Sequence, residues 1–173
     1  LLGRMGNFPA ADPLFREALD LQRKLIGERS LEVAKSLEGL GLNHYDQGNY
    51  DEAVSLLRDA VTMQRELHEG AHPDLAEALN NLGFVTTDNK EAERLFRESL
   101  AMKRLLYAGE AHPEIAMGLN NVAFALHEQR EYDEAEVLYR EAIDMQRQLL
   151  GSDHPDVAMA LNNLSFLSYA KGD

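Results

Sequence analysis

Histidines and carboxylates are the side chains in this sequence that could perform acid–base chemistry or bind a metal ion. The chain has six histidines, thirty acidic residues and no cysteine. A metal site on one helix needs two histidines about one turn apart. His72, His112 and His154 each precede a proline and are 40 and 42 residues apart, and His68 falls at the end of a predicted helix, where a cation is favourable. We therefore predict no metal site and no cofactor.

Motifs for catalysis are equally scarce. Carboxylates lie close together at many points, but chance pairs are expected among so many acids. The sequence contains no Gly-Lys-Ser phosphate loop and no Gly-x-Ser-x-Gly nucleophile elbow. The pattern indicates a protein that is not an enzyme, and a screen with generic hydrolase substrates would test this.

Length and charge narrow the class of protein further. The 173 residues, 45% of them hydrophobic, are enough for one domain with a real core. A formal charge of −13 disfavours nucleic acid and anionic membranes as partners. No apolar run reaches the roughly 18 residues of a membrane-spanning helix, and the start of the chain lacks the apolar core of a signal peptide. Together with the absence of cysteine, these features predict a soluble protein of the cytoplasm.

The chain is built from internal repeats. The stretch HPDLAEALNNLGF at His72 returns as HPEIAMGLNNVAF at His112 and as HPDVAMALNNLSF at His154, and SLEVAKSLEGLGL at Ser30 has the same apolar positions. The repeat starts are therefore 42, 40 and 42 residues apart. A second segment, such as DEAVSLLRDAVTMQREL from Asp51, follows within each unit.

Each unit is predicted to form two antiparallel helices. In the first segment apolar or small residues recur at steps of three and four, and in the second the same period is seen. His72 is the expected N-cap, Pro73 occupies the first helical position, and Asp74 faces the positive helix end. Ser30 takes the place of the histidine in the preceding unit. The apolar or small residues that recur in this way are, in a first segment, Leu75, Ala76, Leu79, Leu82 and Gly83, and in a second segment Ala53, Leu56, Leu57, Ala60 and Met63.

These motifs resemble the tetratricopeptide repeats (TPR) of the kinesin light chain type. The resemblance rests on Leu-Asn-Asn-Leu-Gly, Gly-x-Tyr-x-Glu-Ala and Leu-Tyr-Arg-x-Ala-Ile at a period of 42 residues with a His-Pro-Asp opening. It implies an all-α, right-handed superhelical solenoid of antiparallel helix pairs in a single domain, 1–173. Its approximate repeats are 1–29, 30–71, 72–111 and 112–153, with a closing helix at 154–173. Small residues fall where such helices touch: Gly41, Gly83, Ala123, Ser165, Ala53, Ala92 and Ala135.

The chain ends follow from the same repeat pattern. Leu1 to Met5 is interpreted as the tail of a first helix, and the helix from Pro155 has no second helix after it. We therefore expect a fragment of a longer array, with Leu161, Leu164 and Leu167 on the last helix awaiting a neighbour. Such a face could drive weak end-to-end self-association.

The third repeat is shorter than the others between its two helices. Phe84 and Ala92 are 8 residues apart, whereas Leu42 and Ala53 are 11 apart. The intervening Thr86–Asn89 has poor helix propensity, so the first helix of this repeat should end nearly a turn early. This difference is either neutral loop variation or a notch at the lip of a groove.

The resemblance also implies an inner, concave surface lined by the first helix of each pair. The predicted peptide-binding residues on it are Lys35, Glu38, Glu77, Asn80, Phe84, Met117, Asn120, Phe124, His127, Met159, Asn162 and Phe166. Leu42, Tyr45, Thr87 and Tyr169 share this surface.

Two alternatives remain open for those residues. Asparagine amides can pair with a peptide backbone, or they can bond neighbouring helices, as we favour for Asn81, Asn121 and Asn163. Aromatics at helical spacing are often core, whereas exposed Phe and Met would suit an adaptable groove.

Arginines line the second helices in pairs seven residues apart and should pair with nearby acids rather than bind a partner. These are Arg16, Arg23, Arg58, Arg65, Arg97, Arg104, Arg140 and Arg147.

The functional prediction is a protein–protein interaction scaffold that binds a partner's peptide segment. The alternative is a structural, self-associating or sensor array within a larger signalling protein.

Overall fold

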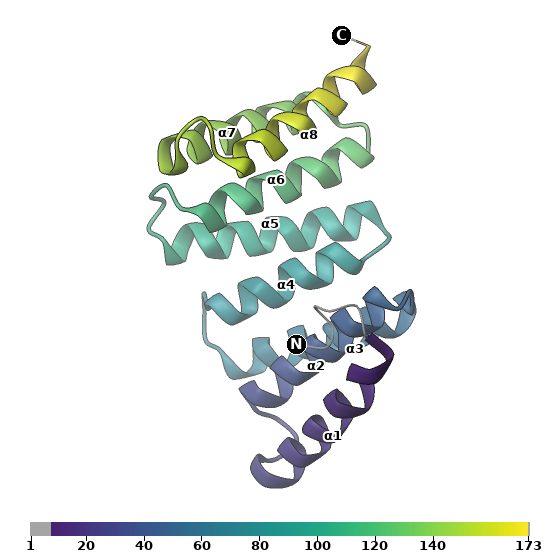
Figure 1. The fold of residues 1–173 in the computed structure, drawn as a ribbon. Coiled ribbons are helices and arrows are strands. Elements are labelled where there is room, and N and C mark those ends of the chain that lie inside the picture. The colour runs from purple at the N-terminus through teal and green to yellow at the C-terminus, as the bar shows by residue number, and fades with distance from the viewer. Residues whose placement is uncertain (1–7, 173) are drawn as a thin grey trace. The chain divides into compact units, whose positions relative to one another are not determined.

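The protein is all-α over the residues that the computed structural model describes, 8–172, where eight helices follow one another without a strand (Figure 1). The helices are α1 (Phe8–Ile26), α2 (Leu31–Asp46), α3 (Tyr50–Leu67), α4 (Pro73–Val85), α5 (Asn89–Leu106), α6 (Pro113–Glu128), α7 (Tyr132–Leu150) and α8 (Pro155–Lys171). The predicted fold class and the alternation of first and second helices are confirmed. The expected helix tail at Leu1 to Met5 lies outside the described residues.

The chain forms two compact units, which meet in sequence between Thr86 and Thr87. In unit 1, α1 packs on α2, α2 on α3 and α3 on α4, and in unit 2 the same order runs from α5 to α8. The first helices of successive repeats also contact each other: α2 contacts α4, and α6 contacts α8. Each unit is therefore a stack of helix pairs, as expected of repeats that bury their faces against neighbours.

The boundary between the units falls in the shortened repeat. The helix α4 has 13 residues, against 16 in both α2 and α6. It ends at Val85, and the hydroxyl of the C-cap residue Thr86 donates to the Leu82 carbonyl at 2.7 Å. The side chain of Asp88 then caps α5 by accepting the backbone N–H groups of Lys90 and Glu91. The predicted early end of this helix is confirmed.

Local caps explain where the first helices begin. The Nδ1 atom of His72 accepts the backbone N–H of Asp74 at 3.2 Å, and His112 and His154 make the same bond at the same distance. The Ser30 hydroxyl accepts from Val33. Each bond satisfies one of the four N–H groups that a helix start leaves without a partner, so the predicted capping role of the histidines is confirmed.

Small residues do allow the helices to approach closely. A Cβ atom at Gly41 would lie 2.9 Å from Cγ of Leu57, and Ala53, Ala123 and Ala135 are fully buried. The interior of each unit consists of such contacts together with leucines and other large apolar side chains.

Two predictions for α8 are wrong. Ser165 is exposed rather than pressed between helices, because α8 is the last helix of the described chain. Leu167 is fully buried and Leu164 partly buried in the core with α6 and α7, so only Leu161, 38% exposed, is left open. The stripe as a whole was expected to face outward, but packing on the preceding repeat covers most of it.

None of the helices in the described part of the chain is both long and apolar enough to cross a membrane.

Candidate functional site

The predicted site residues of unit 1 lie on α2 and α4, and we call the surface that they form the inner face of unit 1. A hollow of about 360 Å³ is lined there by Lys35, Glu38, Leu42, Asp74, Glu77 and Asn81. The same pattern of residues on α6 and α8 forms the inner face of unit 2. Each face combines two first helices that are neighbours in the stack.

Acidic groups dominate the hollow of unit 1. The Lys35 ammonium lies 3.1 Å from Oδ2 of Asp74, and this contact raises the pKa of Lys35. Since Asp74 already offsets the charge of Lys35, Glu38 and Glu77 leave the hollow with a negative balance. An anionic ligand would therefore meet repulsion.

Glu38 is a half-buried carboxyl group at the base of this hollow. Burial is the main reason that its pKa rises to about 7, and the charge of Glu77 raises it further. Two hydrogen bonds act in the opposite direction: Gln64, itself buried, donates from Nε2 at 3.3 Å, and Asn81 also bonds Glu38. The hollow thus contains a carboxyl group that titrates near neutral pH.

An aromatic cluster borders the inner face of unit 1. The rings of Tyr45 and Phe84 lie 5.2 Å apart between centroids, and Tyr50 meets Tyr45 edge-on at 5.5 Å. Phe84 remains 60% exposed, so this ring is not part of the core.

The inner face of unit 2 is apolar and open. Phe124 and Phe166 are 52% and 67% exposed, and Met117 and Met159 are 41% and 56% exposed. The alternative that the phenylalanine column is core is therefore wrong. Four large apolar side chains at equivalent positions of two adjacent first helices form the kind of patch that marks interaction surfaces.

The paired asparagines connect neighbouring first helices. Asn163 of α8 donates from Nδ2 to Oδ1 of Asn120 in α6 at 3.2 Å. In unit 1 the equivalent bond joins Asn81 of α4 to Glu38 of α2. The second asparagine of one repeat thus bonds the first-asparagine position of the repeat before it, which supports the structural role favoured for Asn81 and Asn163.

The remaining predicted residues occupy varied surroundings. Asn162 is exposed and Asn80 half-buried. His127 is half-buried and packs edge-on against Tyr132, with centroids 5.8 Å apart. Tyr169 is 85% exposed, and Thr87 belongs to unit 2 although its predicted neighbour Phe84 belongs to unit 1.

The arginines of the second helices pair with acids, as predicted. Arg97 bonds Glu134 at 2.7 Å, and Arg104 bonds Glu141 at 2.9 Å. Both bonds join the second helices α5 and α7 of successive repeats. These exposed pairs contribute little to stability, but they engage the arginine side chains that would otherwise bind an acidic partner.

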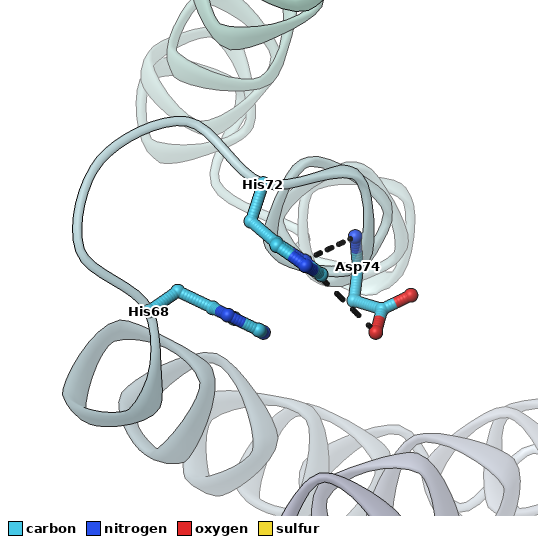
Figure 2. Close-up of side chains that lie close together, drawn as sticks. All are labelled: His68, His72 and Asp74. Carbon is cyan, nitrogen blue, oxygen red and sulfur yellow. Dashed lines mark hydrogen bonds and ion pairs between the residues drawn. The ribbon is translucent and has the colours of Figure 1, made fainter.

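One cluster was missed in the sequence. His68 ends α3 and stacks on His72, with ring centroids 3.4 Å apart and planes inclined by 9°, and Asp74 lies beside them (Figure 2). The available signal was the four-residue spacing of His68 and His72. The repeat pattern does not point to His68, because this residue is not part of the recurring His-Pro motif.

Comparisons with known proteins agree with this architecture. A tetratricopeptide repeat model matches residues 1–66 and 32–104, and a second tetratricopeptide repeat model matches 115–156. No curated protein matches the sequence.

Solved structures of two other proteins share the fold. One is a putative kinesin light chain with nearly identical TPR-like repeats from Podosopora anserina, with 21% identity, a TM-score of 0.85, and coverage of 99% of this chain and 82% of that one. The other is BtubC (BKLC) from P. vanneervenii, with 24% identity, a TM-score of 0.87, and coverage of 99% and 69%. Helices in repeating pairs, three of them opened by His-Pro, and tetratricopeptide repeat models that match most of the chain show that it belongs to the tetratricopeptide repeat family, with a fold similar to that of the solved putative kinesin light chain.

Proposed function

We propose that the inner faces bind a peptide segment of a partner protein, so that the chain acts as a protein–protein interaction scaffold. The observation that carries the proposal is the exposure of Phe124, Phe166, Met117 and Met159 on adjacent first helices of unit 2. Burying such side chains against a partner supplies binding free energy at about 25 cal/mol per Å². Methionine adapts its shape to different apolar ligands.

The charge of the inner faces defines the chemistry of the ligand. The chain carries a formal charge of −13, and Lys35 is engaged by Asp74. We therefore expect an extended or helical segment with apolar anchors and neutral or basic flanks. Because burial dominates over ion pairing, its affinity should change little with salt over the physiological range.

A random peptide display library, selected on the whole chain, tests the proposal. The selected peptides are then titrated against the wild type and Phe124→Ala, with Val137→Ala as the matched control, since Val137 is 63% exposed but lies on the second helix α7. If Phe124 is an anchor, its loss should cost about 1–3 kcal/mol of binding free energy. Peptides that lose affinity with Val137→Ala and not with Phe124→Ala would place binding on the second helices instead.

Self-association is the second candidate, and one observation favours it. A hollow of about 230 Å³ between α7 and α8 is lined by Ile143, Leu161 and Leu164 together with Arg140, Asp144 and Arg147. A copy of the chain could insert an apolar side chain there. Sedimentation velocity across a concentration series, repeated with Leu161→Glu, tests this, and a monomer at all concentrations would refute it.

We also propose that the protein is not an enzyme and that it is located in the cytoplasm. The carboxylates near the inner face of unit 1 serve ion pairs and helix contacts, which is what a scaffold requires. The chain has no cysteine and cannot form the disulfides typical of secreted domains. Fluorescent tagging of the full-length protein in its source cells would test the location.

A further inference from the structure

We propose that His68, His72 and Asp74 form a binding site for a divalent transition-metal ion of the Zn²⁺ class at the junction of α3 and α4. Each of these residues offers one ligand atom, and the three atoms lie within 4.8 Å of one another. Two imidazoles and one carboxylate are a donor set that Zn²⁺ and its neighbours in the first transition row accept. The inference is independent of peptide binding.

The backbone brings these side chains together. His68 is the extended residue that ends α3, and His72 is the extended N-cap of α4. A tight loop connects them, with Gly70 in the left-handed region at φ 86°, and returns the second imidazole over the first (Figure 2). Asp74 is fixed in the first turn of α4.

Comparison with the equivalent junction in unit 2 shows which features of this arrangement are structural and which could bind a metal. There Tyr107 stacks on His112, with centroids 3.4 Å apart and planes inclined by 10°. The stack itself is thus a feature of the repeat that needs only an aromatic ring. What His68 adds over Tyr107 is an imidazole nitrogen beside a second imidazole and a carboxylate.

The imidazole of His68 also has a polar atom that the fold leaves unsatisfied. The Nε2 atom of His68 is buried without a hydrogen-bond partner among the described residues. A buried polar atom without a partner is destabilising, so a ligand that engages it is favoured.

Metal binding would compete with the helix cap. The Nδ1 atom of His72 accepts the backbone N–H of Asp74 at 3.2 Å and lies 4.0 Å from Oδ2 of the same residue. Its lone pair therefore faces that N–H group, with the carboxylate nearby, and an ion would take the lone pair in place of the N–H group. In tetrahedral zinc sites ligand atoms are about 3.3 Å apart, so modest rotations that tilt the two rings would complete the geometry.

The positive charges around the site act against a bound cation. A helix N-terminus repels cations, and the Lys35 ammonium contacts the same oxygen of Asp74 at 3.1 Å. An ion bound to Asp74 would therefore compete with Lys35 for this carboxylate oxygen. Water would supply the remaining coordination positions, since the three residues are only half-buried.

Titration calorimetry of the whole chain with Zn²⁺ alone tests the inference. We expect one saturable site per chain. His68→Tyr reproduces the Tyr107–His112 stack and removes a ligand, and His72→Asn keeps a good N-cap while it removes another. Each should weaken binding by at least about tenfold, the lower end of the loss seen when even indirect partners of a metal are removed.

The matched control is His154→Asn, the same change at a cap histidine that has Leu150 in place of His68, and it should leave the affinity unchanged. Circular dichroism verifies that each variant is folded, and if His68→Tyr is not, His72→Asn decides. Substitution by Co²⁺ should give visible absorption bands that His68→Tyr abolishes. Absence of a saturable site in the wild type, wild-type affinity in both site variants, or a loss in His154→Asn as large as in the site variants would overturn the inference.

Discussion

Replacing Glu38 by glutamine should stabilise the protein at alkaline pH and leave its stability unchanged at acidic pH. Glutamine has the same shape as protonated glutamate and retains an oxygen to accept the Gln64 hydrogen bond, which is 3.3 Å long in the wild type. The substitution therefore removes the charge of this half-buried group and little else.

The pKa of Glu38 gives the size and sign of the effect. The pKa of Glu38 is 4.5 in the unfolded chain and about 7 in the folded protein. At pH values between these two, the folded state holds a proton that the unfolded state has lost. Stability must then fall as pH rises through this window, and the full penalty applies above it. A shift of one pKa unit is worth about 1.36 kcal/mol, so the penalty from the charged Glu38 has an upper limit of about 3.4 kcal/mol. Solvent screening of a half-buried group reduces the expected gain for Glu38→Gln to about 1–2 kcal/mol.

Urea unfolding followed by circular dichroism at pH 4, below both pKa values, and at pH 8 measures this difference. The control is Glu69→Gln, which removes one acid from the exposed loop of the same unit and should change the free energy of unfolding by less than about 0.5 kcal/mol at either pH. If Glu38→Gln gave the same gain at both pH values, or destabilised the protein at pH 8, burial would not be what controls this carboxyl group.

Four further substitutions test the packing of the repeats. Gly41→Ala places a Cβ 2.9 Å from Cγ of Leu57 and should lower the free energy of unfolding by about 1–3 kcal/mol in chemical denaturation. Asn163→Ala removes the hydrogen bond to the preceding repeat and should cost about 1 kcal/mol by the same measurement. Glu114→Gln removes the charge from the 2.8 Å ion pair with Lys103, which is 4% exposed, and because Glu114 itself is 43% exposed it should cost about 1–3 kcal/mol in thermal or urea unfolding. Lys103→Gln, which installs the residue found at this position in the other repeats, should be nearly neutral, and a large loss would contradict the argument.

Features that depend on neighbours in sequence were predictable from the sequence. The helix pairs follow from apolar residues at three- and four-residue steps. The histidine caps depend on a bond to a residue two positions later, and the early end of α4 depends on the weak helix formers that follow it. Each of these features depends on interactions between residues within about one helical turn. Because the chain is built from repeats, the same sequence signals occur several times in it.

Features that depend on contacts across repeats were decided by the tertiary structure. The sequence could not tell whether Phe124 is core or surface, because helical spacing is the same for both and only packing leaves it 52% exposed. It could not show that Leu167 is covered by α6 and α7, or that the pKa of Glu38 rises through burial and the charge of Glu77. The His68–His72 stack likewise arises from the path of the loop between two helices. Sequence periodicity determines which face of a helix is apolar, but burial, protonation and side-chain clusters depend on what the folded chain places against that face.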